Sequence, residues 1–456
     1  MIRHTETTAA REIGPPRYTD GIPAIDHHSH AGYLRPGATV EGMDGVEREM
    51  VLSHVEANLP SDVYLRYVEA ERHRDTEQLA ELRGQWPIDS LFEEGLRFRE
   101  TSMHTVTLFD GAAQLFGDIG REAQIHASLA GRVEAPQAQY ERALVLAGTP
   151  AVLTDVPEID TTVWPAEKYR QIARIDPYLY PFGHPSWDRR GSDTPRFRRI
   201  FGFVLERQYE LMGVSNRPQT LDDYLDFVRA SLRQRVAGGV VGLKIASAYV
   251  RSLRFEDVSR ADAAEAYTRL GALETPDPGL VNAVADHVVF AIAEEAVQLN
   301  LPVQVHTGVG HAEPGIRVDD ANPLHLQQLL DTPRLNQLKV ILIHGGFPFT
   351  DYLTALAYTH GNVYLDTSLL PHLHGRRAER ALEDWLTYLP ANKVLFGTDT
   401  GNPEHHVTSA QRARAALDTV LTAGVANGWW STRQAHWLTE RVLHRNLTDV
   451  YGVEIP

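Results

Sequence analysis

The chain has 456 residues, of which 43% are apolar and 23% charged, a composition typical of a globular protein with a sizeable core. Its 44 basic against 60 acidic residues give a formal net charge of −16, which argues against a nucleic-acid partner or an anionic membrane surface. No apolar run approaches the roughly 18 residues that would span a bilayer. Because cysteine is absent, disulfides, thiolate nucleophiles and Cys-ligated zinc are excluded, and any metal must be held by His, Asp, Glu or a modified Lys.

The first 20 residues lack the apolar core of a secretory signal. We expect them to form a partly ordered N-terminal arm on a cytoplasmic protein. A single barrel domain is expected to follow over residues 21–456.

Short apolar runs rich in β-branched residues alternate with helical stretches. The first predicted strand covers 21–25 and leads into the sequence Asp-His-His-Ser-His at 26–30. Seven further strands are predicted at 151–156, 171–178, 240–249, 301–308, 339–346, 362–368 and 393–400. Residues 40–148 have helical composition and predict a helical insertion after strand 1. Eight alternations of this kind favour an α/β fold, a (β/α)8 TIM barrel, over a doubly wound sheet, since no Gly-rich fingerprint follows the first strand.

A His-x-His pair stands at the end of the first predicted strand. Side chains two residues apart point to the same face of a strand, so His28 and His30 project together, with Asp26 behind them. Two imidazoles on one face can grip a metal ion. The pattern is short enough to occur by chance, and it gains weight only from the other strands.

Four later apolar runs also end with a chemically capable residue. These residues are Lys244, His306, His344 and Asp399. The carboxyl ends of barrel strands converge on the active site. Unpaired polar groups in a barrel interior are costly, so packing alone explains this pattern poorly. The sequence therefore predicts a metal site built from these strand ends.

Together these residues give His-x-His on strand 1, His on strands 5 and 6 and Asp on strand 8. This order resembles that of the amidohydrolase superfamily of metal-dependent barrel hydrolases. The segments GLKIASAY, VHTG, IHGG, LFGTD and RNLTDVYG are most similar to the amidohydrolase-related branch. That branch contains domains fused to glutamine synthetase-like proteins and also aromatic-acid decarboxylases.

The resemblance implies that His28, His30, His306 and Asp399 surround a divalent metal, with Zn²⁺ the expected ion. Asp399 would also take a proton from the attacking water and pass it to the leaving group. His344 would either orient the water and polarise a carbonyl, or ligate a second metal.

Lys244 decides between one metal and two. Only four of the 44 basic residues are Lys (Lys168, Lys244, Lys339 and Lys393), so a Lys inside an apolar strand suggests chemistry that Arg cannot supply. In some superfamily members a strand-4 Lys is carboxylated and bridges two metals. The alternative is that Lys244 contacts a carboxylate of the substrate or of the protein, and the sequence leaves both open.

Three residues near strands 3 and 4 are candidate substrate contacts. Tyr249, Arg251 and Arg174 could hold a substrate carboxylate through hydrogen bonds, although a solvated loop arginine is the more common role. His405 and His406 follow Asp399 closely, and we expect them to form a loop pair.

These residues predict a metal-dependent hydrolase that cleaves an amide, cyclic amide or ester/lactone bond by metal-activated water. Asp399, His344 and Lys244 are the expected catalytic residues. Two alternatives stay open: a non-oxidative decarboxylase of an aromatic or unsaturated acid on the same metal site, and a non-catalytic scaffold or signalling barrel. The expected partner is a small-molecule substrate, and analogy of fold suggests a homodimer.

Overall fold

A computed structural model gives the fold of the chain, and it describes residues 17–32, 34–37, 48, 50–73, 75–183, 194–310 and 316–453. Most of the expected N-terminal arm, residues 1–16, lies outside this part. Within the described residues, none of the helices combines the length and the apolarity needed to cross a bilayer.

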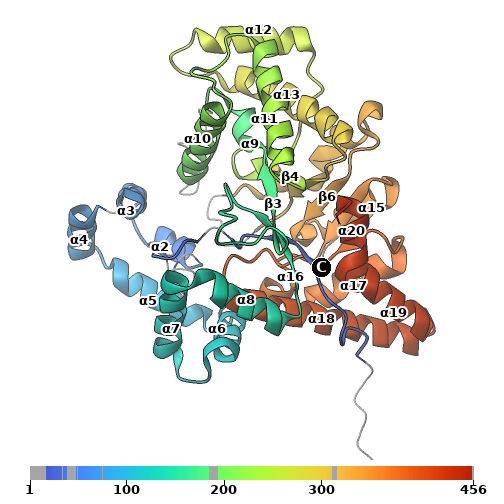
Figure 1. Cartoon of the computed structure of the whole chain (residues 1–456). Helices are drawn as coiled ribbons and strands as arrows, with labels where there is room; N and C mark the ends of the chain where they lie inside the picture. The colour runs from blue at the N-terminus through green and yellow to red at the C-terminus, as the bar shows by residue number, and fades with distance from the viewer. Residues whose placement is uncertain are drawn as a thin grey trace, which may run out of the picture.

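Eight parallel strands follow one another around a nearly closed barrel (Figure 1). They are β1 (Asp26–Ser29), β2 (Val152–Asp155), β3 (Tyr169–Arg174), β4 (Gly242–Ile245), β5 (Val303–His306), β6 (Val340–Ile343), β7 (Val363–Asp366) and β8 (Val394–Leu395). Each strand pairs with the next, from β1 to β8. The predicted (β/α)8 barrel is confirmed.

The position of the first strand was predicted wrongly. The strand is Asp26–Ser29, whose side chains are all buried, and not the apolar run at 21–25. Pro23 has no amide hydrogen for a ladder, whereas the Asp26 amide donates to the Ala151 carbonyl beside β2. The polar side chains of β1 are tolerated inside the barrel because they bond to one another and to neighbouring segments.

Between β1 and β2 the chain forms the predicted helical insertion. Its helices are α2 (Leu52–Ala57), α3 (Ser61–His73), α4 (Thr76–Gln85), α5 (Ile88–Arg99), α6 (Met103–Phe116), α7 (Arg121–Glu134) and α8 (Pro136–Ala147). Figure 1 shows these helices gathered at one side of the barrel, where α6 and α8 lie against the long helix α18 (Pro403–Ala426).

The remaining helices are distributed along the rest of the chain. They are α9 (Asp176–Leu179), α10 (Thr194–Leu211), α11 (Leu221–Ala237), α12 (Arg260–Gly271), α13 (Pro278–Gln298), α14 (Gln327–Leu330), α15 (Thr350–Thr359), α16 (Leu370–Leu373), α17 (Arg377–Tyr388), α19 (Thr432–Glu440) and α20 (Asn446–Tyr451). A short 3-10 turn, η2 (Ser247–Tyr249), follows β4.

Helix α18 begins earlier than the sequence suggests. Asn402 caps it by accepting a hydrogen bond from the His405 amide, so His405 and His406 lie in its first turns and are buried. The expected loop pair is therefore wrong.

The side chain of Tyr451, in the last helix, enters the barrel interior at the amino-terminal end of the strands. The hydroxyl of Tyr451 in α20 accepts a hydrogen bond from Gln304 Nε2 (2.8 Å) and lies 3.1 Å from His27 Nδ1. On its other side, His27 Nε2 lies 2.8 Å from Asp366 Oδ2. A Cβ on Gly242, the first residue of β4, would come within 2.9 Å of the Tyr451 ring. The glycine therefore leaves room for Tyr451.

The contact between α6 and α18 depends on Gly111. A Cβ at this position would overlap the carbonyl oxygen of Glu404, so the helices could not stay as close. We expect Gly111→Ala to destabilise the protein by about 1–3 kcal/mol, measured as a lower denaturant midpoint.

Gly84→Ala is the matched control, because Gly84 is an exposed residue of α4 and an added methyl would meet nothing within 4 Å. It should be neutral or stabilise by up to about 1 kcal/mol. Equal effects of the two substitutions would contradict the close-contact explanation.

Candidate metal centre

The carboxyl ends of five strands bring ionisable side chains together. His28 lies in β1 and His30 directly after it, Lys244 lies in β4, and His306 ends β5. His344 follows β6 and Asp399 follows β8. The rings of the four histidines form a chain, in which neighbouring centroids lie 5.4 Å (His30–His28), 5.2 Å (His28–His344) and 4.5 Å (His344–His306) apart.

One carboxylate stands at the centre of this group. Nε2 of His28 and Nε2 of His30 each lie 3.0 Å from Oδ1 of Asp399. Nδ1 of His344 lies 3.5 Å from the other oxygen, Oδ2. Potential ligand atoms of His28, His344 and Asp399 all lie within 4.8 Å of one another, which is close enough to share one ion.

The hydrogen bonds of His30 test whether a cation fits here. Nδ1 of His30 donates to the backbone carbonyl of Asp155 (2.8 Å), because a carbonyl can only accept. In the neutral imidazole, Nε2 then carries a lone pair that faces an Asp399 oxygen at 3.0 Å. Two acceptors at this distance require a cation between them, either a proton or a metal ion. A backbone acceptor that fixes the tautomer is also the usual outer partner of a metal-bound histidine.

Burial favours the neutral form of three of these imidazoles, those of His28, His306 and His344. Burial, assisted by the Lys244 amine, lowers the pKa of His28 to about 4, and burial holds the pKa values of His306 and His344 well below their usual range. Burial alone would raise the pKa of Asp399, but the neighbouring His344 and His28 outweigh it and hold that pKa well below its usual range. Neutral imidazoles around an ionised carboxylate are the protonation states that a divalent metal requires.

The ligand-bearing segments meet along the β1–β8 seam, formed by residues 26–30 on one side and 396–400 on the other. The His28 carbonyl accepts hydrogen bonds from the amides of Asp399 (2.8 Å) and Thr398 (3.3 Å). Asp26 adds a side-chain bridge, since its Oδ1 accepts from the amides of His28 and Thr398 (3.0 Å each) and its Oδ2 from the Thr398 hydroxyl (2.5 Å). The seam therefore fixes Asp399 relative to His28.

Two of the clustered residues have unusual backbone conformations. His344 (φ 75°) and Asp399 (φ 58°) both lie in the left-handed region, which residues other than glycine rarely adopt. The His344 amide is held there by Asp366 Oδ1 (2.8 Å) and Ser368 Oγ (3.1 Å). Such strain tends to collect at functional sites, where the surroundings enforce it.

Lys244 reaches the same cluster from β4. Its Nζ lies 3.2 Å from Nε2 of His28, and the side chain is buried. No ion pair joins it to a carboxylate among the described residues, so the structure gives no protein carboxylate as its partner. Burial lowers the pKa of Lys244, although the nearby Asp155 and Asp399 act in the opposite direction.

Two of the three predicted substrate contacts lie near the cluster. The Tyr249 hydroxyl is 3.2 Å from Nδ1 of His306, and its ring stacks on Phe197. Arg174, at the end of β3, pairs with the buried Asp155 at the end of β2. Burial would raise the pKa of Asp155, but Arg174 holds it below its usual range.

Arg251 has protein partners that the sequence did not reveal. Its guanidinium is buried, pairs with Asp286 of α13 (2.7 Å) and donates to the carbonyls of Ser252 (3.1 Å) and Arg254 (2.6 Å). These contacts hold the guanidinium within the fold. The structure thus gives the predicted substrate contact of Arg251 no support.

Asp155 and Tyr140 lie near the cluster but were not among the residues predicted from the sequence. Asp155 follows the apolar residues of β2, so the rule that selected the other strand ends could have found it. Tyr140 lies on α8, and its hydroxyl approaches the seam only through the tertiary fold. Its position carries no local signal.

An eight-stranded barrel with imidazoles, a carboxylate and an amine gathered at the carboxyl ends of its strands is the architecture of metal-dependent TIM-barrel enzymes. A family model described as amidohydrolase matches residues 216–449. The chain belongs to this amidohydrolase family, and the family implies a divalent metal.

Among curated proteins, Protein fluG of Emericella nidulans is 31% identical over 162 residues, a stretch that covers 35% of this chain and 18% of fluG. Among solved structures, a candidate metal-dependent hydrolase from Lactobacillus casei has a TM-score of 0.65 at 17% identity, covering 95% of this chain and 96% of its own. Glucuronate isomerase from Caulobacter crescentus has a TM-score of 0.64 at 16% identity, covering 95% and 92%. At these identities the structures establish the fold alone.

The bridge made by Asp26 can be tested through stability. Asp26→Ala would leave the buried His28 amide without its acceptor and weaken the bonding of Thr398, at a cost of about 2–4 kcal/mol from one or two groups. Asp26→Asn keeps an oxygen for both amides and should cost less than about 1 kcal/mol. Denaturant midpoints of the metal-free variants measure both effects, and an Ala variant as stable as the Asn variant would contradict the bridging role.

Proposed function

We propose that the protein is a metal-dependent hydrolase that cleaves an amide, cyclic amide or ester/lactone bond. The observation that carries the proposal is the convergence of His28 Nε2 and His30 Nε2 on one oxygen of Asp399, at 3.0 Å each. Zn²⁺ is the ion we propose, because two imidazoles and a carboxylate without thiolates match a catalytic zinc set.

His28, His30 and Asp399 would hold the ion, with His344 or His306 completing the set. When bound, a divalent ion lowers the pKa of a coordinated water and polarises a carbonyl oxygen. Asp399 accepts the proton of the attacking water and donates it to the leaving nitrogen or oxygen. His344, held by Asp366 and Ser368, donates to or orients the oxygen on which negative charge develops.

Lys244, Arg174 and Tyr249 would face the substrate. Lys244 is a buried amine with no carboxylate partner among the described groups. An oxygen of the substrate would supply this partner. The Arg174 guanidinium is anchored by Asp155 along one edge, which leaves its remaining N–H groups for a ligand. The Tyr249 hydroxyl lies 3.2 Å from Nδ1 of His306, at the carboxyl end of β5.

Isomerisation of a sugar acid is a second candidate. The structure of glucuronate isomerase covers 95% of this chain, so the helical insertion is part of the similarity. A panel of amides, lactones, aromatic acids and uronates separates the candidates. Release of an amine or acid indicates hydrolysis, release of CO2 indicates decarboxylation, and formation of a keto sugar acid indicates isomerisation.

Asp399→Asn tests the proposed proton transfer. We expect kcat/KM to fall by at least about 100-fold while the melting temperature of the protein stays close to that of the parent. Asp351→Asn, an exposed substitution in the first turn of α15, is the control and should leave activity unchanged. Full activity of Asp399→Asn would remove Asp399 from the mechanism.

Metal content distinguishes one ion from two. We expect plasma mass spectrometry to find about one divalent ion per chain in protein purified without chelator. Lys244→Met should keep that ion and lose at least about 100-fold in turnover, because the amine contacts substrate. Lys168→Met is the control, since Lys168 pairs with Glu141 at the surface.

A ratio near two in the parent, falling in Lys244→Met, would instead assign a carboxylated Lys244 as a bridging ligand. Absence of any divalent metal, even after titration, would refute the hydrolase proposal and favour a non-catalytic barrel.

A further inference from the structure

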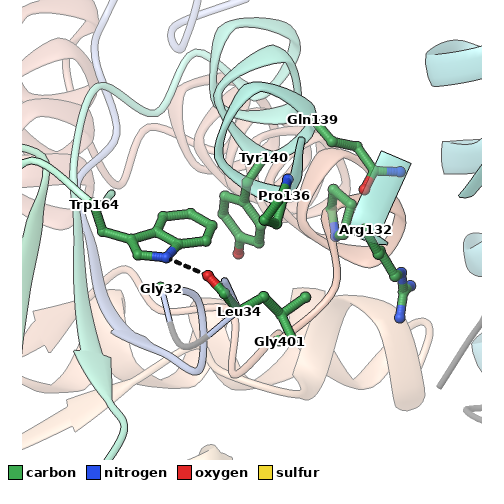
Figure 2. Close-up of a pocket in the computed structure, with 9 residues that line it drawn as sticks. Gly32, Leu34, Arg132, Pro136, Gln139, Tyr140, Trp164 and Gly401 are labelled. Atoms are coloured by element: carbon green, nitrogen blue, oxygen red, sulfur yellow. Dashed lines mark hydrogen bonds between the residues drawn. The ribbon is translucent and has the colours of Figure 1, made fainter. Parts of the chain in front are cut away.

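Tyr140 brings a hydroxyl from the helical insertion to the candidate metal centre. It lies on α8 and is buried, and its hydroxyl oxygen is 3.4 Å from the Thr400 carbonyl, 3.4 Å from Ser29 Oγ and 3.3 Å from His406 Nδ1. Figure 2 shows its ring between Trp164 and Pro136, at the wall of a small pocket that Gly401 also lines.

These contacts touch both sides of the β1–β8 seam. Ser29 stands between His28 and His30, and Thr400 follows Asp399. The Thr400 carbonyl also accepts hydrogen bonds from Ser29 Oγ (2.9 Å) and from the His30 amide (3.0 Å). Tyr140 therefore contacts the point at which the two ligand-bearing segments are already joined.

His406 links the same point to helix α18. Its Nδ1 lies 3.3 Å from the Tyr140 hydroxyl and 3.3 Å from Thr400 Oγ1. Thr400 Oγ1 in turn lies 2.9 Å from the Thr398 hydroxyl, which donates to Asp26. A continuous chain of hydrogen bonds thus runs from Tyr140 in the insertion to Asp26 in β1.

Packing alone does not require this hydroxyl. Tyr169 belongs to the same aromatic cluster and is equally buried, with its ring 4.9 Å from Trp164 and 6.3 Å from Tyr140. Its hydroxyl has no hydrogen-bond partner among the described groups. A tyrosine hydroxyl is therefore compatible with this cluster whether or not it is bonded, and only that of Tyr140 reaches the seam.

We propose that Tyr140 is a positioning residue of the metal centre, through which the helical insertion fixes the β1 and β8 segments that carry His28, His30 and Asp399. The proposal rests on the proposed metal-dependent function. Tyr140 contacts no candidate ligand atom itself. It acts on the spacing of the ligands through Ser29 and Thr400, as outer partners of metal ligands do.

The test compares Tyr140→Phe with the matched control Tyr169→Phe, both in the whole 456-residue chain. Each substitution removes one buried hydroxyl and keeps the ring. The probe is Co²⁺, titrated into protein stripped of metal, with its visible absorption as the readout. We expect Tyr140→Phe to bind Co²⁺ about tenfold more weakly than the parent and to show an altered absorption band. Tyr169→Phe should match the parent in both respects.

Melting temperatures of the metal-free proteins separate positioning from general destabilisation. We expect the two variants to melt within a few degrees of each other. A Tyr140→Phe variant with the Co²⁺ affinity and spectrum of the parent would overturn the positioning role while leaving the proposed function intact. Equal weakening in both variants would also overturn it, because loss of packing would then be the cause. A parent that binds no Co²⁺ would overturn both proposals.

Discussion

The hydrogen bonds from the amides of Thr398 and Asp399 to the His28 carbonyl are the contact on which the rest of the site depends. Strand β8 has only two residues, so a long ladder cannot align it with β1. Two further backbone bonds continue the closure, from the His27 amide to the Phe396 carbonyl (3.1 Å) and from the His30 amide to the Thr400 carbonyl (3.0 Å). The Asp26 side chain reinforces them by accepting from the Thr398 amide and hydroxyl. The same irregular backbone turns Asp399 towards the histidines of β1. The same hydrogen bonds therefore close the barrel and position Asp399 relative to the histidines.

The polar interior shows how a barrel can carry so many ionisable groups. Most buried polar groups in the seam have a defined partner, and the partners come from segments far apart in sequence, such as Asp26 and Thr398 or His27 and Asp366. Nδ1 of His28 has no hydrogen-bond partner among the described groups. Burial without such partners would cost several kcal/mol for each group. Among the clustered residues, the carboxylate of Asp399 and the amine of Lys244 have mainly imidazole nitrogens as their neighbours. Those are the groups expected to gain most from a cation or a substrate.

The strand order and the strand-end residues could be predicted from sequence because each depends on local pattern: an apolar run, then a polar residue. The position of β1 was predicted wrongly because the residues of this strand are polar. Their burial depends on partners from β7 and from the segment after β8. His405 and His406 were placed in a loop because the capping role of Asn402 depends on backbone geometry. The partner of Arg251 is on α13, and the contact of Tyr140 with Thr400 spans most of the chain. No local rule contains such information.

Tyr451 connects the last helix, α20, to the candidate metal centre through hydrogen bonds. It enters the barrel beside Gly242, at the end of the strands opposite to the histidines, and bonds to Gln304 and His27. His27 contacts Asp366, which holds the His344 amide. Proteolytic removal of α20 would therefore leave Gln304 and His27 without the Tyr451 hydroxyl and would leave a cavity at this end of the barrel. Loss of α20 would thus affect the candidate metal centre from the opposite end of the barrel.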